Sequence, residues 1–186
     1  MLSGVNVLDI YRAAGGYLEG HFLLASGRHS PKFLQSTTVT QHPEHADAFG
    51  RALAGLFPDA RPDFVIGPAM GGVVLAYVTA RAFDCRALFA EKDGAGTMLI
   101  REAFEVKAGE QFIAVEDVVT TGGSLHKAVA AAEAAGAECR GRACIIDRRP
   151  EAEVDIAIHS LTQLTFPTYE PETCPLCAAG VPLEEV

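Results

Sequence analysis

QFIAVEDVVTTGGS, residues 111–124, is the stretch from which the fold of this chain can be worked out. Gln111–Val115 is a mostly apolar run whose length and β-branching suit a strand buried in a parallel sheet. Two acids and a loop of small residues follow, and Leu125–Ala135 then carries apolar residues at helical spacing, ended near Gly136. The order strand, acids, loop, helix predicts an α/β unit with a ligand site at the carboxyl end of its strand.

The loop itself predicts a phosphate site. It consists of Thr120, Thr121, Gly122, Gly123 and Ser124. Backbone N–H groups and hydroxyls at a helix N-terminus converge on one point, where the helix dipole favours an anion and glycine permits a close approach. A plain turn in which Ser or Thr only caps the helix is the alternative. The acid pair next to the loop argues for a site, and neither GxxxxGK[ST] nor GxGxxG occurs in the chain.

The acids Glu116 and Asp117 add a second requirement. Carboxylates beside a phosphate would repel it unless they engage something else, such as ribose hydroxyls, a Mg²⁺ ion or both. The residues alone therefore predict a sugar-phosphate site, with the acids on the sugar and the loop on the phosphate.

VEDVVTTGGS resembles the phosphoribosyl pyrophosphate (PRPP) signature of the type I phosphoribosyltransferases, in which two acids and two apolar residues precede a Thr-x-Gly-x-Ser type of loop. The resemblance implies that Glu116 and Asp117 are catalytic residues, together with Lys92. It also implies PRPP contacts from Lys92, Glu116, Asp117, Val118, Val119, Thr120, Thr121, Gly122, Gly123 and Ser124.

Composition indicates a globular protein and argues against several other classes. At 186 residues, with 49% hydrophobic and 21% charged residues, one α/β domain is expected. A net charge of −9, with four Lys and eleven scattered Arg, argues against a nucleic-acid partner. The N-terminus has no basic region followed by a long apolar one, so no membrane segment is expected. Five Cys without an export signal indicate reduced thiols in a cytoplasm.

A second strand, loop and helix unit precedes the first. Phe64–Ile66 is a buried strand, the Gly-rich turn Gly67–Gly72 follows, and Val73–Phe83 is helical in pattern. This turn predicts a weaker anion cradle because it lacks hydroxyls. It resembles the pyrophosphate-binding loop of the family, which implies that role for Ala69, Met70, Gly71 and Gly72. Gly71 stands where many orotate enzymes of the family have a lysine.

The N-terminal segment indicates which base is bound. Phe22–Leu24 predicts a strand, residues 25–28 a turn, and Lys32–Leu34 a further extended segment. This hairpin resembles the hood of the orotate phosphoribosyltransferases. The matching residues are Phe22, Leu24, Ser26, Gly27, Arg28 and Ser30, and the resemblance implies orotate contacts from Phe22, Ser26, Gly27 and Arg28. Many members have a lysine where this chain has Ala25, and a plain connecting loop is the alternative interpretation.

Arg148 is the predicted partner of a carboxylate on the base. It follows the strand Glu138–Ile146, in the sequence Asp147-Arg148-Arg149, so it should face the edge of the sheet that carries the phosphate loops. Guanidinium binds carboxylate bidentately, and orotate is the nucleobase that bears a carboxylate. The Asp-Arg pair also matches the family's orotate-contacting arginine, and Thr120 is implied beside it. A surface salt bridge after a strand is the alternative.

A long connection, Glu91–Gly109, follows the predicted strand Arg86–Ala90. Loops of this length are usually functional, and the corresponding family segment closes over the active site, often that of the partner subunit. Lys92 matches one of its basic positions, whereas the downstream Lys-x-His is not recognisable. Arg101 is the candidate substitute cation, with an ordinary surface hairpin as the alternative.

Two other patterns raise the question of a metal. Cys174 and Cys177 form a CxxC, which has the spacing of a zinc half-site, but one pair does not supply four ligands. Whether the pair binds zinc is left open, including the alternative that two half-sites meet across a dimer. His42 and His45 precede and begin the helical pattern Pro43–Phe57 and are interpreted as a solvated helix start.

Taken together, the residues and the resemblance predict an α/β protein with a type I phosphoribosyltransferase fold. A central, mostly parallel sheet is flanked by helices, the core spans about residues 42–150, and a small hood is formed by residues 15–38 with part of the C-terminal region. The implied activity is the conversion of orotate and PRPP to orotidine 5′-monophosphate and pyrophosphate in pyrimidine synthesis. Mg²⁺ is the implied cofactor, held mainly by substrate oxygens rather than by a protein metal site, in a cytoplasmic homodimer. A purine phosphoribosyltransferase and a PRPP-binding regulator without catalysis remain the alternatives.

Overall fold

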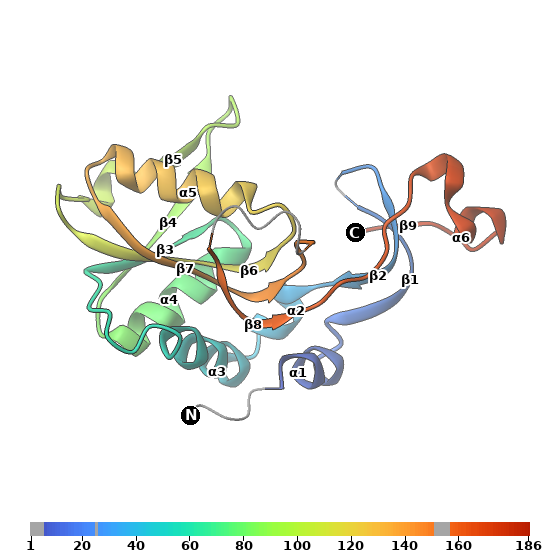
Figure 1. Ribbon diagram of the computed structural model, residues 1–186, viewed down its shortest axis with the longest axis horizontal. Helices are drawn as coiled ribbons and strands as arrows, with labels where there is room; N and C mark the ends of the chain where they lie inside the picture. Colours follow the sequence, from blue (N-terminus) through green and yellow to red (C-terminus); the bar gives the residue numbers. More distant parts are fainter. Residues whose placement is uncertain (1–5, 25, 151–156) are drawn as a thin grey trace.

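A computed structural model describes residues 6–24, 26–150 and 157–186, and within them six strands form the main sheet in the order β5-β4-β3-β6-β7-β8 (Figure 1). The strands are β3 (Phe64–Pro68), β4 (Arg86–Lys92), β5 (Met98–Ile100), β6 (Gln111–Val119), β7 (Glu138–Asp147) and β8 (His159–Gln163). Neighbouring strands are parallel except for the antiparallel pair β4 and β5. The predicted mostly parallel sheet is confirmed.

Helices cover both faces of this sheet (Figure 1). One face carries α1 (Val7–Ala13), α3 (Pro43–Ala54) and α4 (Gly71–Phe83), and the other carries α5 (Gly123–Ala134). The central strand β6 contributes side chains to the cores on both faces of the sheet, because alternate residues of a strand point to opposite faces. Ile113 and Val115 belong to the α3/α4 core, whereas Phe112 and Ala114 belong to the α5 core. Burial on both sides explains why β6 is apolar over consecutive residues.

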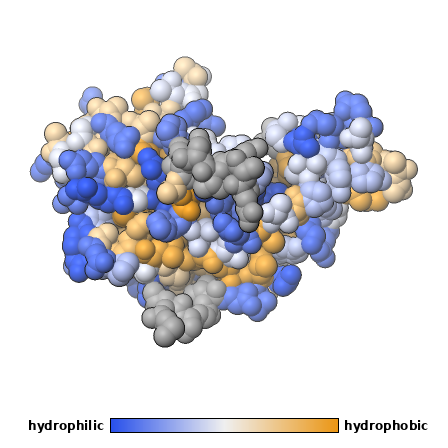
Figure 2. All heavy atoms as spheres, viewed as in Figure 1, coloured by the Kyte–Doolittle hydropathy of each residue, from blue (hydrophilic) through white to orange (hydrophobic). Residues whose placement is uncertain are grey.

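A second, three-stranded sheet stands apart from the main body and forms a separate lobe of the surface (Figures 1 and 2). Strands β1 (Tyr17–Leu23) and β2 (His29–Leu34) form an antiparallel hairpin, and β9 (Glu184–Glu185), from the other end of the chain, pairs in parallel with β1. The short helix α2 (Ser36–Thr40) leads from this sheet to α3, and the 3₁₀ turn η3 (Pro171–Thr173) and helix α6 (Pro175–Ala178) lie beside it. We call this unit, β1, β2 and residues 168–186, the hood.

Two central segments differ from the predicted pattern. Strand β6 continues through both acids to Val119, because β7 pairs with it as far as Asp147. The connection expected over Glu91–Gly109 is largely ordered structure: β4 and β5 form a hairpin, followed by the 3₁₀ turn η1 (Glu102–Phe104). The Asp93 carboxylate accepts the N–H groups of Ala95 and Thr97 and so fixes the tip of that hairpin.

The ends of other elements shift for similar reasons. The first hood strand begins at Tyr17 rather than Phe22, because β2 supplies hydrogen-bonding partners along its length. The edge strand expected over Val154–Leu164 is present as β8, whereas Val154 and Ile156 lie outside the described residues. None of the described helices combines the length and the apolar character needed to cross a membrane.

Candidate active site

The two acids of the central strand point to opposite faces of the sheet. The Glu116 carboxylate accepts the backbone N–H of Leu125 in the first turn of α5. The Asp117 carboxylate instead lies against Gly71 at the start of α4. Because successive residues of a strand alternate in direction, each predicted loop receives one carboxylate.

The Gly-rich turn before α4 is closely packed around this carboxylate. A Cβ on Gly71 would lie 2.9 Å from each Asp117 oxygen, so a side chain at this position would have to displace the carboxylate. A Cβ on Gly67 would lie 2.3 Å from the carbonyl oxygen of Gly72, so the turn closes only with glycine at this position. Ala69 and Met70 complete the turn, and the Met70 side chain is exposed.

The predicted phosphate loop lies where β6 passes into α5. Gly122 has a φ of +79°, which favours glycine, and as the N-cap residue of α5 it provides no side-chain cap. The hydroxyl residues Thr120, Thr121 and Ser124 are exposed. Helix α5 therefore begins without a side-chain cap and with exposed hydroxyls beside its N-terminus, an arrangement that favours an anion.

A cavity of about 320 Å³ adjoins this loop. Its lining residues are Thr121, Gly122, Gly123, Leu125, His126, Arg142, Arg149 and Ile158. The Arg142 Nε is buried and has no hydrogen-bond partner among the described residues. Arg142 and His126 were not predicted from the sequence; the available signal was an arginine directly before the apolar half of β7, residues 143–146.

Burial decides the protonation of Glu116. Loss of solvation, helped by the adjacent Asp117 charge, raises the pKa of Glu116 to about 8, against a smaller opposing effect from the Leu125 N–H. A carboxyl with such a pKa is largely protonated at neutral pH when no cation or ligand is bound. A hydroxyl donor or a cation near it would shift this balance towards the carboxylate.

The two arginines that follow Asp147 at the end of β7 contact different partners. Arg149 donates from Nε and Nη2 to the buried Asp147 carboxylate, at 3.0 and 2.8 Å. Burial raises the pKa of Asp147, but the hydrogen bonds from Arg149 outweigh that effect and the pKa is below its usual value. This salt bridge is buried and belongs to Arg149, whereas the alternative role for Arg148 was a salt bridge at the surface.

Arg148 is held by an aromatic ring instead. Its guanidinium carbon lies 3.7 Å from the centroid of the Phe166 ring, and its Nε has no hydrogen-bond partner among the described residues. Desolvation lowers the pKa of Arg148, although a guanidinium stays charged at any physiological pH. Stacking fixes the plane of the group, which is the arrangement suited to a planar carboxylate.

The predicted base-contacting residues of the hood are in different environments. The Phe22 ring is buried and packs near Phe33, with ring centroids 6.0 Å apart. Ser26 and Gly27 are exposed at the hairpin turn, where Gly27 has a φ of +79°. Arg28 donates to the hydroxyl and carbonyl of Thr168, both at 2.9 Å, and pairs with Glu170. The turn residue Ala25 lies outside the described residues.

The two candidate cations of the β4–β5 hairpin differ in their partners. Lys92 is the last residue of β4 and is exposed. Arg101 pairs with Glu91, and this contact raises the pKa of Arg101 and lowers that of Glu91. A cation that is already paired is a weaker substitute for a missing lysine than a free one.

Fold and site together define a class: two strand-loop-helix units with an acid pair between their loops at one edge of a parallel sheet. Residues 35–164 match the family model described as the phosphoribosyl transferase domain. The chain belongs to the phosphoribosyl transferase family.

Relatives that match along the full length narrow the assignment within the family. The chain is 55% identical over 183 residues to the orotate phosphoribosyltransferase of Thermus thermophilus, covering 98% of this chain and 100% of that protein. It is 50% identical to the orotate phosphoribosyltransferase of Deinococcus radiodurans, with both chains covered completely. Similarity of this extent places the chain with the orotate phosphoribosyltransferases of the family.

Solved structures agree in fold. The orotate phosphoribosyltransferase of Aeropyrum pernix superposes with a TM-score of 0.71 at 22% identity, covering 85% of this chain and 93% of that one. The adenine phosphoribosyltransferase of Leishmania tarentolae superposes with a TM-score of 0.63 at 15% identity, covering 88% and 89%. Because enzymes named for different bases share the fold, the fold alone does not select the base.

Proposed function

We propose that the protein transfers the 5-phosphoribosyl group of PRPP to orotate, giving orotidine 5′-monophosphate and pyrophosphate, as a step of pyrimidine synthesis. Arg148 carries the proposal: its half-buried guanidinium directly follows the carboxyl end of β7, is held against the Phe166 ring, and suits the orotate carboxylate. The full-length identity to proteins named orotate phosphoribosyltransferase supports it independently.

In this proposal the bond from the anomeric carbon to pyrophosphate breaks and a bond to the orotate ring nitrogen forms, through an oxocarbenium-like state. The protein positions the groups and stabilises charge. Residues 120–124 hold the 5-phosphate, and the turn at residues 67–72 holds pyrophosphate with Lys92. Glu116 and Asp117 engage the ribose hydroxyls from the two faces of β6. Orotate enters as an anion at its ring nitrogen, so no strong general base is needed.

Mg²⁺ is the proposed cofactor. The residues present fit it: Glu116 and Asp117 offer hard oxygen donors, and the raised pKa of Glu116 is the condition that a nearby cation relieves. When bound, mainly through substrate oxygens, Mg²⁺ would neutralise charge on the pyrophosphate leaving group.

A cytoplasmic homodimer is part of the same proposal. Three exposed apolar side chains on or next to α4, Met70, Val74 and Tyr77, recur at helical spacing and so share one face of the helix. Met70 belongs to the predicted pyrophosphate turn, so a partner docked here would adjoin the site. Sedimentation velocity should give a dimer mass, and Tyr77→Glu should shift it to a monomer. A monomeric parent protein would contradict the dimer.

The activity is tested by the decrease in ultraviolet absorbance as orotate is consumed, with PRPP, with and without Mg²⁺. Parallel reactions contain hypoxanthine, adenine or uracil. We expect turnover only with orotate and only with Mg²⁺. Turnover of a purine would favour the purine alternative, and PRPP binding without turnover of any base would favour a regulator.

A further inference from the structure

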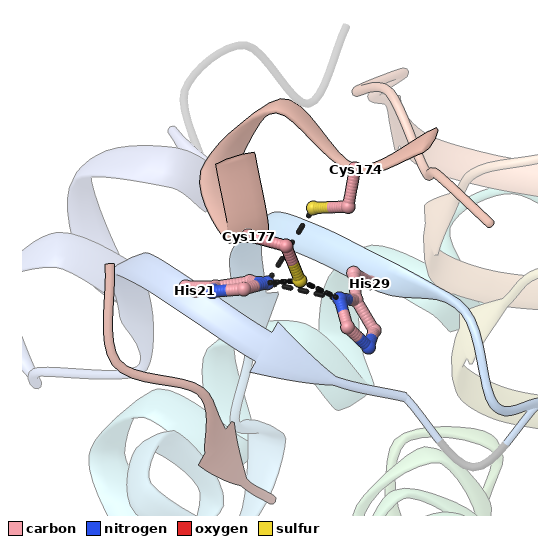
Figure 3. Close-up of side chains that lie close together, drawn as sticks. All are labelled: His21, His29, Cys174 and Cys177. Carbon is pink, nitrogen blue, oxygen red and sulfur yellow. Dashed lines mark hydrogen bonds between the residues drawn. The ribbon is translucent and has the colours of Figure 1, made fainter. Parts of the chain in front are cut away.

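Four metal-ligating side chains meet in the hood, remote in sequence from one another and outside the site described above. His21 comes from β1, His29 begins β2, and Cys174 and Cys177 come from the N-cap and body of α6. Figure 3 shows the four side chains pointing toward one centre from these separate elements. One ligand atom of each lies within 4.8 Å of those of all the others.

Of four short separations among the ligand atoms, three match tetrahedral coordination and the His21–His29 distance is shorter; every pair of ligand atoms lies within 4.8 Å. The Nε2 of His21 lies 3.0 Å from the Nδ1 of His29 and 3.5 Å from the Sγ of Cys174. The Sγ of Cys177 lies 3.3 Å from the Nδ1 of His29 and 3.8 Å from the Nε2 of His21. With Zn–N bonds of about 2.0 Å and Zn–S bonds of about 2.3 Å, ligand atoms around a tetrahedral ion lie about 3.3–3.8 Å apart.

The backbone prepares His21 for this role. The Nδ1 of His21 is 2.8 Å from the carbonyl oxygen of Val181, and because a carbonyl can only accept, Nδ1 carries the proton. In the neutral ring, Nε2 is left with a lone pair directed at the cluster. A second hydrogen bond that orients a ligating imidazole in this way accompanies most protein metal sites.

The C-terminal segment needs a fastening of this kind. Among residues 170–186, only Cys174 is buried. The segment pairs with β1 only through β9, over two residue pairs. Such a segment has almost no apolar core to hold it, and small units without a core are usually stabilised by metals or disulfides. All five cysteines are free thiols in this structure.

We propose that His21, His29, Cys174 and Cys177 bind one structural Zn²⁺ ion that fastens the C-terminal segment to the β1–β2 hairpin. Two thiolates, two neutral imidazoles and Zn²⁺ carry no net charge, so the ion can be held where three of its four ligands are buried. Four protein ligands close the coordination shell, which is typical of structural sites and leaves no position for substrate. The inference does not depend on the proposed orotate activity.

The first test is the metal itself, measured on the full-length protein expressed with zinc in the medium and purified without an affinity tag. Elemental analysis by inductively coupled plasma mass spectrometry should give about one zinc per chain. X-ray absorption spectroscopy should show two sulfur ligands at about 2.3 Å and two nitrogen ligands at about 2.0 Å. Replacement by Co²⁺ should give the visible bands of a tetrahedral thiolate complex. Folded protein that lacks zinc and does not take up Zn²⁺ or Co²⁺, or that contains a Cys174–Cys177 disulfide, would overturn the proposal.

The second test assigns the ligands. Cys177→Ser and His29→Ala should each lower the zinc content at least tenfold, whereas Cys139→Ser, at a partly buried cysteine on β7, should leave it unchanged. Hydrogen exchange keeps the test valid if a variant is unstable: removing zinc from the parent protein should deprotect residues 168–186 and leave β6 protected. Retention of zinc by both ligand variants, or equal deprotection of the tail and β6 on zinc removal, would contradict the assignment.

Discussion

The Asp117 carboxylate fills the space beside Gly71, so that a Cβ on that glycine would stand 2.9 Å from both of its oxygens. The contact joins the two strand-loop-helix units of the site across the sheet. A side chain at position 71 would therefore compete with the Asp117 carboxylate for the same space.

Gly71→Ala should therefore displace the Asp117 carboxylate and lower kcat/KM for PRPP roughly tenfold, equivalent to about 1.4 kcal/mol. Gly94→Ala is the matched control, because a Cβ there meets nothing within 4 Å. In an Asp117→Asn background the loss caused by Gly71→Ala should shrink, since residues in contact are energetically coupled. Independent, additive losses in steady-state kinetics would show that the contact is without consequence.

The buried carboxyl of Glu116 should make stability depend on pH. Its folded pKa of about 8 lies above its unfolded value, so the folded state binds the extra proton and stability falls as pH rises from about 4.5 to 8. Glu116→Gln should remove that decline and be more stable than the parent at pH 8 by about 2 kcal/mol, less than the full linkage value because the side chain is partly exposed. Urea unfolding at several pH values measures this.

The control for that experiment is Glu133→Gln, at an exposed position of α5. It should leave the pH profile of stability as it is in the parent protein. Parallel profiles for Glu116→Gln and the parent would mean that Glu116 is ionised throughout.

Arg148 tests the choice of base. Arg148→Lys keeps the charge but loses the planar, bidentate group and its stacking on Phe166, so kcat/KM for orotate should fall about 10–100-fold. Arg140→Lys, at an exposed salt bridge with Glu138, should have no effect. Unchanged orotate kinetics in Arg148→Lys would remove the main structural argument for orotate.

Lys92 and Arg101 should respond differently to loss of charge. Lys92→Gln is expected to raise the KM for PRPP about tenfold or more, because the free cation is proposed to face pyrophosphate. Arg101→Gln should change it less than threefold, because Glu91 already offsets that charge. Steady-state kinetics at constant ionic strength compare the two, and a larger effect from Arg101 would reverse the assignment.

Local features of the sequence predicted most of the helices, strands and loops of the core. The apolar run before Glu116, the glycines at both turns and the alanine-rich helix after Ser124 act through neighbours in sequence, so their structure could be foreseen. Strand ends could not: β6 continues to Val119 only because β7 pairs with it. The exact extent of a strand depends on its partner, which local sequence does not contain.

Side-chain partners were least predictable. From the sequence Asp147-Arg148-Arg149 alone, either arginine could form the salt bridge with Asp147. In the folded protein Arg149 forms it, and Arg148 packs against the Phe166 ring. The CxxC near the C-terminus predicted half a metal site, and its potential completion by His21 was missed because 153 residues separate that histidine from Cys174.

The sequence by itself therefore determined the parallel sheet, the two glycine-containing strand-to-helix loops and the acid pair, because periodicity, glycine and helix N-termini act over a few residues. Only the tertiary structure decided which face each acid serves, which arginine is left for a ligand and which histidines join the cysteines. Those outcomes depend on packing between segments far apart in the chain, where burial and hydrogen-bond geometry choose among partners that sequence leaves equivalent.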